Sequence, residues 1–299
     1  RRFQKKLASI RVLDPACGSG NFLTESYLSL RKLENRVIED LQGDQMGLGL
    51  DGDAEPIEVS INQFYGIEIN DFAVSVAKTA LWIAEEQMME ATQEILLREF
   101  DFLPLKSNSN IREGNALRMN WNEVLPAERC SYIIGNPPFV GASMCAASQK
   151  QEIVDLFGKI KLSNSLDYVS GWYYKAAEMM LANAVIKAAF VSTNSITQGE
   201  QVYPIWNTLR SRFGIHIDFA WRTFVWNSET AGKAHVHCVI VGFSIGGGEG
   251  LIFDGGRSDG ASSGRKDVVN PYLVHAPWVI LASRKRPLCD VPALAYGNK

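Results

Sequence analysis

The sequence lacks any long apolar run. Its uncharged apolar stretches, such as Trp278–Ala282, fall far short of the roughly 20 residues that a membrane-spanning helix needs. The first residues, Arg-Arg-Phe-Gln-Lys-Lys, are charged and no apolar run follows them, which is not the pattern of a secretory signal. These absences exclude a transmembrane helix and a cleaved signal, and we expect no membrane partner.

Paired cysteines are also lacking. The five cysteines are scattered, their number is odd, and none forms a Cys-x-x-Cys pair. This usage is typical of a reducing compartment, so we expect a cytoplasmic protein. His235 and His237 lie on one face of a predicted strand, but no Cys or carboxylate stands at ligand spacing nearby. We interpret them as a packed strand pair and expect no metal site.

A strong net charge is missing as well. The 30 Lys and Arg residues against 33 Asp and Glu residues leave a charge of −3, which argues against a basic surface for wrapping DNA but not against a local cleft. Residues 251–299 carry seven basic and four acidic side chains, so residues 1–250 hold a charge of −6. Glycine-rich segments at 246–250 and 255–260 lie where the net charge changes from negative to positive. We therefore predict a first domain over 1–248, then a linker and the beginning of a second region over 249–299.

Strand-like and helix-like segments alternate along the first region. Apolar runs predict strands at 11–14, 64–69, 111–113, 132–135, 188–192, 215–219 and 236–243. Helical spacing predicts helices at 21–37, from Asn70 or Asp71 onward, at 168–182 and at 200–212. This alternation predicts an α/β fold with a Rossmann-like, seven-stranded, mostly parallel sheet flanked by helices. Ligands of such sheets bind at the carboxyl ends of the strands.

The first strand is followed by the loop Asp14-Pro-Ala-Cys-Gly-Ser-Gly20. Gly18 and Gly20 permit backbone conformations and close approaches that a Cβ would prevent. No Lys-Ser/Thr follows, and position 23 is Leu where dinucleotide folds have a third glycine. The loop therefore favours a ligand without phosphates, or a tight turn without any ligand.

Polar side chains stand at the ends of the next two strands. Glu68 can accept hydrogen bonds from both hydroxyls of a ribose, as acidic residues do at this place in dinucleotide folds, or it is simply an exposed acid. An insertion near 42–56 must loop out, because more residues separate Glu68 from Gly20 along the sequence than in those folds. Asn115 offers an amide to the edge of an adenine.

The fourth loop, Asn136-Pro-Pro-Phe139, indicates the chemistry. The prolines hold Asn136 extended, with its amide projecting from the end of the strand. An aromatic amine attacks a methyl sulfonium only when acceptors draw its N–H bonds into a more tetrahedral arrangement. The side-chain oxygen of Asn136 and the backbone carbonyl of Pro137 are two such acceptors. Phe139 offers a flat surface to a base that has left its helix.

The loops at Asp14–Leu23 and Asn136–Phe139 resemble motifs I and IV of class I amino-methylating DNA methyltransferases, in the γ order. The segments at 167–173, 190–196 and 224–229 are similar to the MmeI-like family, which fuses restriction and modification in one polypeptide. The resemblance implies transfer of a methyl group from S-adenosyl-L-methionine to N6 of a flipped adenine in double-stranded DNA. It also implies a nuclease segment and a full target-recognition domain elsewhere in the parent chain.

The resemblance also implies the roles of individual residues. Catalysis would involve Asn136, Pro137, Pro138 and Phe139. The base would be contacted by Phe139, Asp167, Phe224 and Trp226. The cofactor would be bound by Asp14, Pro15, Ala16, Gly18, Gly20, Asn21, Phe22, Glu68, Ile69, Asn115, Ala116 and Asn136.

Two departures from the family's pattern qualify these expectations. Only ten residues precede Arg11, so we expect the helical motif X to be missing and cofactor affinity to be weak. Residues 270–299 resemble the opening of a target-recognition domain that stops early, so we expect little sequence-specific DNA binding. The alternatives are methylation of cytosine N4, of RNA or of a protein glutamine, and a nonenzymatic module that senses the cofactor.

Overall fold

A computed structural model describes residues 1–45, 56–97, 110–158, 160, 163–226, 236–248, 250–254, 268–282 and 290. The helices are α1 (Arg2–Ser9), α2 (Asn21–Gln45), α3 (Asp71–Leu96), α4 (Ala147–Phe157), α5 (Ser170–Ala182) and α6 (Val202–Phe213). The strands are β1 (Val12–Asp14), β2 (Phe64–Glu68), β3 (Ile111–Glu113), β4 (Tyr132–Gly135), β5 (Lys187–Thr193), β6 (His216–Trp226), β7 (Val236–Ser244) and β8 (Leu251–Phe253). None of the helices in these ranges is long and apolar enough to cross a membrane.

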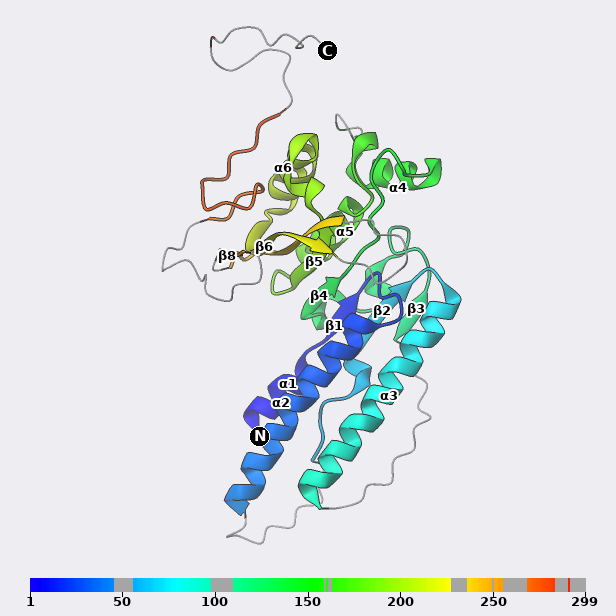
Figure 1. The fold of residues 1–299 in the computed structure, drawn as a ribbon, viewed down its shortest axis with the longest axis vertical. Helices are drawn as coiled ribbons and strands as arrows, with labels where there is room; N and C mark the ends of the chain where they lie inside the picture. Colours follow the sequence, from blue (N-terminus) through cyan, green and yellow to red (C-terminus); the bar gives the residue numbers. More distant parts are fainter. Residues whose placement is uncertain are drawn as a thin grey trace.

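The strands in the described ranges form one sheet in the order β3-β2-β1-β4-β5-β7-β6-β8 (Figure 1). Neighbours from β3 to β5 run parallel, and β7 lies antiparallel between β5 and β6. The strand order reverses between β1 and β4, which is where ligands bind in open α/β sheets. The carboxyl ends of β1, β2, β3 and β4 therefore lie at one edge of the parallel half of the sheet.

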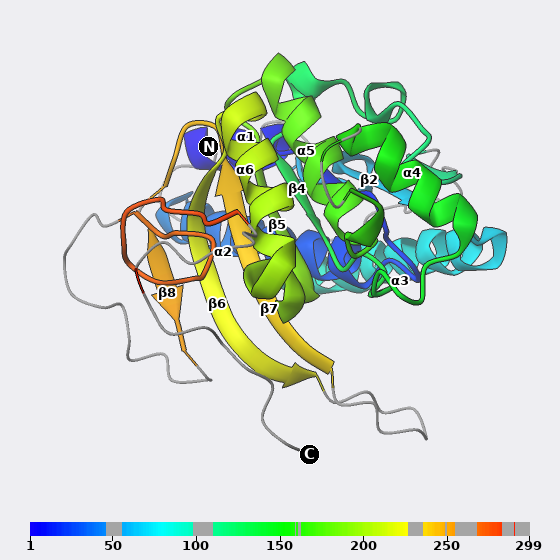
Figure 2. The same ribbon diagram turned by 90° about the horizontal axis from the view of Figure 1, so that it is seen from above.

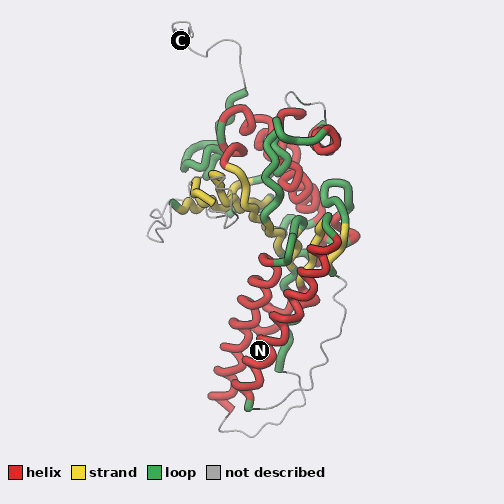
Figure 3. Tube along the Cα trace, turned by 45° about the vertical axis from the view of Figure 1, so that its right-hand side comes forward, coloured by secondary structure: helices red, strands yellow, loops and turns green. Residues whose placement is uncertain are grey.

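Alternating side chains divide the core into two layers. Val12 and Phe64 pack with α2 and α3 in one cluster, whereas Leu13 and Ile133 pack with α5 and α6 in the other. Helices α2 and α3 lie side by side and extend well past the sheet (Figures 1 and 3). Strands β6 and β7 form a long twisted hairpin that reaches beyond α5 and α6 (Figure 2).

The predicted α/β class is confirmed, and so is the start of α3, where the side chain of Asn70 accepts a hydrogen bond from the Ala73 amide at 3.0 Å. Among the α-helices and strands, three are additional to the prediction, namely α1, α4 and β8. The sheet thus has one strand more than the seven expected, because β8 pairs with β6 beyond residue 248. The domain boundary at 248 stays a prediction, and most of the insertion near 42–56 lies outside the described residues.

A buried polar network holds α1, α2 and the segment before β2 together. Glu34 is fully buried and forms an ion pair with Arg31. It also accepts hydrogen bonds from Gln4 Nε2 at 2.9 Å and from the Glu58 amide at 2.7 Å. Buried charges of this kind are stable only while they are paired and hydrogen-bonded.

We expect Glu34→Ala to lower the free energy of unfolding by about 3–5 kcal/mol, because it leaves Arg31 buried without a counter-charge. Urea unfolding measures this change. Glu25→Ala, on the exposed side of the same helix, is the matched control and should change stability by less than about 0.5 kcal/mol. Equal effects of the two substitutions would show that the network does not stabilise the fold.

Candidate active site

The loop after β1 is held tightly against its neighbours. Asp14 is 1% exposed, and its Oδ1 accepts a hydrogen bond from the Ala16 amide at 3.0 Å. A Cβ at Gly135 would lie 2.5 Å from that same oxygen, so β4 can approach β1 only with glycine there. Gly20 has a φ of +86°, and a Cβ on it would meet Ala77 at 3.0 Å. The glycines therefore serve close packing as well as backbone freedom.

Burial raises the pKa of the Asp14 carboxyl from 3.8 to about 7. The Ala16 amide opposes this shift, and the negative charge of Glu68 adds to it. A cationic group bound beside Asp14 would favour the ionised carboxylate. The protonation state of the Asp14 carboxyl therefore depends on the charge of any group that binds beside it.

Glu68 connects two of the predicted loops. Its Oε2 accepts a hydrogen bond from the Gly18 amide at 2.9 Å, and its Oε1 accepts one from the Asn70 amide at 2.9 Å. Each carboxylate oxygen has a second lone pair that can accept a hydroxyl group of a ligand. The neighbouring Ile69 is 67% exposed, an apolar side chain open to a flat ligand at the edge of the sheet.

Asn115 lies in a cluster that the sequence analysis did not anticipate. Its Oδ1 accepts a hydrogen bond from the Leu117 amide at 2.9 Å, and its Nδ2 donates to Glu152 Oε1 at 3.0 Å. Glu152, a buried residue of α4, also accepts hydrogen bonds from Arg118 Nε and the Tyr168 hydroxyl. The amide of Asn115 is thus fixed in one orientation. The helical spacing of Ile153 and Phe157 was the available signal for α4.

Asn136 follows β4 directly, as predicted. Its Oδ1 is buried, and among the described residues no donor lies within hydrogen-bonding distance of it. Leaving such an acceptor unpaired costs about 1–3 kcal/mol, so a ligand donor is the expected partner. Pro137 beside it is buried, whereas Phe139 is partly exposed at the same edge.

The carboxylate of Asp167 is occupied by protein donors. It accepts hydrogen bonds from the Ala142 amide at 2.8 Å, from Gln201 Nε2 at 3.2 Å and from the hydroxyl of Ser195. These contacts hold the chain that follows Phe139. Asp167 therefore holds this loop in place. The sequence analysis did not identify its partners Ser195 and Gln201.

The remaining predicted residues lie around this edge or further along the sheet. Trp172 Nε1 donates to the Pro15 carbonyl at 3.0 Å, so α5 anchors the first loop. Phe224 pairs with Cys238 near the end of β6, and two strands separate β6 from β4. The side chain of Trp226 lies outside the described part of the chain. Asn21 and Phe22 begin α2, and Ala16 and Ala116 line the first and third loops.

Comparison with known proteins identifies the family of this chain. Residues 1–254 match the family described as "MmeI, DNA-methyltransferase domain". The chain belongs to this family. DNA methyltransferase A of Bacillus subtilis (strain 168) is 40% identical over 301 residues, which are 98% of this chain and 32% of that protein. The structure of the type IIL restriction-modification enzyme MmeI in complex with DNA superposes with a TM-score of 0.89 at 43% identity, over 100% of this chain and 40% of that one.

This MmeI-type methyltransferase domain spans about a third of the length of DNA methyltransferase A and 40% of the solved MmeI chain. Within the described ranges, no group of three His, Cys, Asp or Glu residues is placed to hold a metal ion. The four loops that carry the site residues expected from the sequence lie at one edge of the sheet of this domain.

The raised pKa of Asp14 makes the stability of the domain depend on pH. The folded protein holds this proton more tightly than the unfolded chain, so the stabilisation is complete below pH 3.8 and is lost as pH rises through about 7. We expect the wild type to lose stability relative to Asp14→Asn over that interval, as measured by urea unfolding at a series of pH values. A difference that stays constant with pH would contradict the shift.

Proposed function

We propose that this domain transfers a methyl group from S-adenosyl-L-methionine to N6 of an adenine extruded from double-stranded DNA. The observation that carries the proposal is the buried, unpaired Oδ1 of Asn136 at the end of β4. An exocyclic amine supplies the N–H donor that this acceptor lacks. The sequence Asn-Pro-Pro-Phe, with Asn ahead of the prolines, favours adenine over cytosine.

The residues present fit the cofactor. Gly18, at a φ of +52°, leaves open space where a Cβ would stand, so the first loop can receive the methionine part. Glu68 retains acceptor capacity for the ribose hydroxyls, and the exposed Ile69 and the fixed Asn115 flank the place for the adenine. When bound, the cofactor supplies an activated methyl group on a positively charged sulfur.

Asn136 and Pro137 prepare the amine for attack. The Asn136 oxygen and the Pro137 carbonyl each accept one N–H of the amine, which turns its lone pair out of the plane of the ring. Pro137 and Pro138 restrict the backbone, so these acceptors need little reorganisation. The aromatic face of Phe139 stacks on the base, a contact worth about 1–3 kcal/mol. In this account Asp167 holds the loop that carries these groups, and Phe224 of β6 is the candidate to contact the other side of the base.

The relatives support DNA as the substrate and a larger architecture for the polypeptide. MmeI was solved in complex with DNA and is named a restriction-modification enzyme. Since this chain spans under half of that protein, we infer that its parent polypeptide also holds a nuclease segment and a full target-recognition domain.

We expect Asn136→Ala to abolish methyl transfer and to leave S-adenosyl-L-methionine binding nearly unchanged, because it removes an acceptor for the amine and not for the cofactor. Calorimetry measures binding, and nucleoside analysis of treated DNA measures transfer. Asn207→Ala, at an exposed position of α6, is the control and should retain full activity.

The same nucleoside analysis separates the alternatives. N6-methyladenine supports the proposal, whereas N4-methylcytosine identifies the other amino-methylating reaction. Cofactor binding without methylation of DNA, RNA or protein glutamine identifies a sensing module. Loss of cofactor binding in Asn136→Ala would assign that residue a different role.

Glu152 is a positioning residue in this account. We expect Glu152→Ala to raise the KM for S-adenosyl-L-methionine about tenfold and to leave kcat within about threefold, because the Asn115 amide then loses the acceptor that holds it. Glu178→Ala, which removes the ion pair between the half-exposed Glu178 and Lys175, should change neither value. A fall in kcat at unchanged KM would place Glu152 with the base instead of the cofactor.

A further inference from the structure

The loop that begins at Asn194 lies beside the loop that begins at Asn136. Strands β4 and β5 pair in parallel, and Gly135 is level with Phe190. Since Asn136 follows Gly135, Asn194 lies three residues beyond the position level with Asn136. An inter-strand spacing of about 4.8 Å and a rise of about 3.3 Å per residue place the two Cα atoms about 11 Å apart. A purine held by a hydrogen bond of about 2.9 Å at each end can span that separation.

The carboxylate of Asp167 joins these two loops. Its Oδ1 accepts a hydrogen bond from the Ala142 amide at 2.8 Å, in the chain that follows Phe139. Its Oδ2 accepts a hydrogen bond from the hydroxyl of Ser195, the neighbour of Asn194. The two loops are therefore held next to each other, on either side of one carboxylate.

The backbone around Asn194 is fixed by further contacts. The Asn194 carbonyl accepts a hydrogen bond from Thr197 Oγ1 at 2.8 Å. Ile196 is fully buried, and its carbonyl accepts a hydrogen bond from Trp206 Nε1 at 2.7 Å. Asn194 therefore occupies a rigid turn at the carboxyl end of β5.

The side-chain amide of Asn194 is not used in holding this turn. Asn194 is partly exposed, and within the described ranges its amide makes no hydrogen bond. The hydroxyls of Ser195 and Thr197, in contrast, both bond to the protein. An asparagine amide offers two N–H donors and one acceptor, so Asn194 is available to a ligand at this edge of the sheet.

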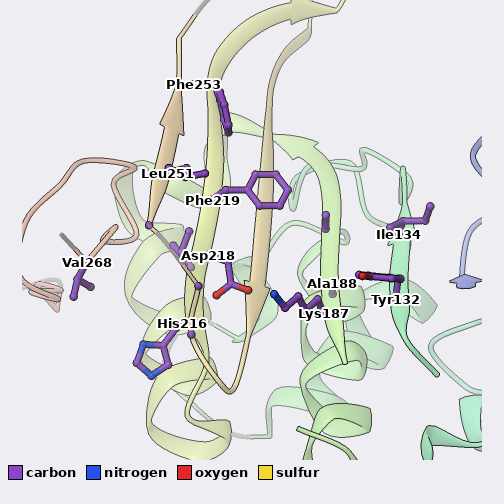
Figure 4. A pocket seen from close by; sticks show the side chains of 15 residues that line it. Tyr132, Ile134, Lys187, Ala188, His216, Asp218, Phe219, Leu251, Phe253 and Val268 are labelled. Carbon is purple, nitrogen blue, oxygen red and sulfur yellow. The ribbon is translucent and has the colours of Figure 1, made fainter. Parts of the chain in front are cut away.

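The cavity in Figure 4 lies at a different place. Its volume is about 940 Å³, and it is lined by Tyr132 and Lys187, the first residues of β4 and β5. Because these strands run parallel, the cavity lies towards their amino ends, whereas Asn136 and Asn194 follow their carboxyl ends. A base that is bound by Asn136 therefore lies on the side of Asn194 and not in this cavity.

The hydrogen-bonding groups of adenine determine what Asn194 can contact, given the proposed function on which this inference rests. Both N–H groups of N6 are taken by Asn136 and Pro137 in that account. The ring nitrogens N1 and N7 flank N6 and are acceptors that still lack a donor. We propose that Nδ2 of Asn194 donates a hydrogen bond to one of these two ring nitrogens of the extruded adenine. Asn194 is then a base-contacting residue that orients the ring so that N6 is directed at the Asn136 oxygen.

Substitutions at Asn194 give the first test. We expect Asn194→Ala to lower kcat/KM for DNA about tenfold, and Asn194→Asp, which has nearly the same shape but no N–H donor, to do so at least as much. The KM for S-adenosyl-L-methionine should stay unchanged, because the contact is made to the base. Gln198→Ala, at an exposed position of the same loop, is the matched control and should retain full activity.

Altered bases identify the partner atom. DNA is prepared in which the methylated adenine is replaced by 7-deazaadenine or by 1-deazaadenine, each with a C–H group in place of one ring nitrogen. We expect one of these replacements to slow the wild type about tenfold and to leave Asn194→Ala at the rate that it has with adenine, because the hydrogen bond is missing in either case. If each replacement slows wild type and variant by the same factor, Asn194 contacts neither nitrogen and the proposal is wrong.

The methylated product distinguishes this inference from the proposed function. A product other than N6-methyladenine contradicts the proposed function and, with it, this inference. N6-methyladenine that forms without coupling between Asn194 and a ring nitrogen contradicts this inference alone.

Discussion

The arrangement of the site depends on one buried acceptor, the side-chain oxygen of Asn136. It lies at the end of β4, where the strand order reverses, and no donor among the described residues satisfies it. The fold maintains this unfavourable state because two prolines restrict the loop and Asp167 holds the chain that follows. A protein group in this state is prepared for a ligand, and the donor that we propose is an exocyclic amine.

The loops that we propose for the cofactor lie at the same edge of the sheet as the Asn136 oxygen. Gly135 precedes Asn136 and packs directly on Asp14, so the first and fourth loops meet without an intervening side chain. Glu68 holds the first loop to the second, and Glu152 of α4 holds the third. Because α4 follows the fourth loop in the chain, Glu152 connects the third loop to the segment that comes after the fourth.

Sequence reasoning located the four loops, because glycine, proline and acidic residues follow short apolar strands there. It also placed the start of α3 from Asn70. It could not find the partners of Asn115 and Asp167, since Glu152, Ser195 and Gln201 are ordinary polar residues until folding buries them. The short β8 was missed because three apolar residues between glycine-rich segments have no periodicity, and its pairing with β6 is a tertiary contact.

A structure of the domain bound to DNA and to a nonreactive analogue of S-adenosyl-L-methionine tests the central claim most directly. The account predicts an extruded adenine whose N6 lies within about 3.2 Å of the Asn136 oxygen, with its ring against Phe139. A complex in which that oxygen stays unpaired or bonds to another part of the protein, with the base elsewhere, would contradict it.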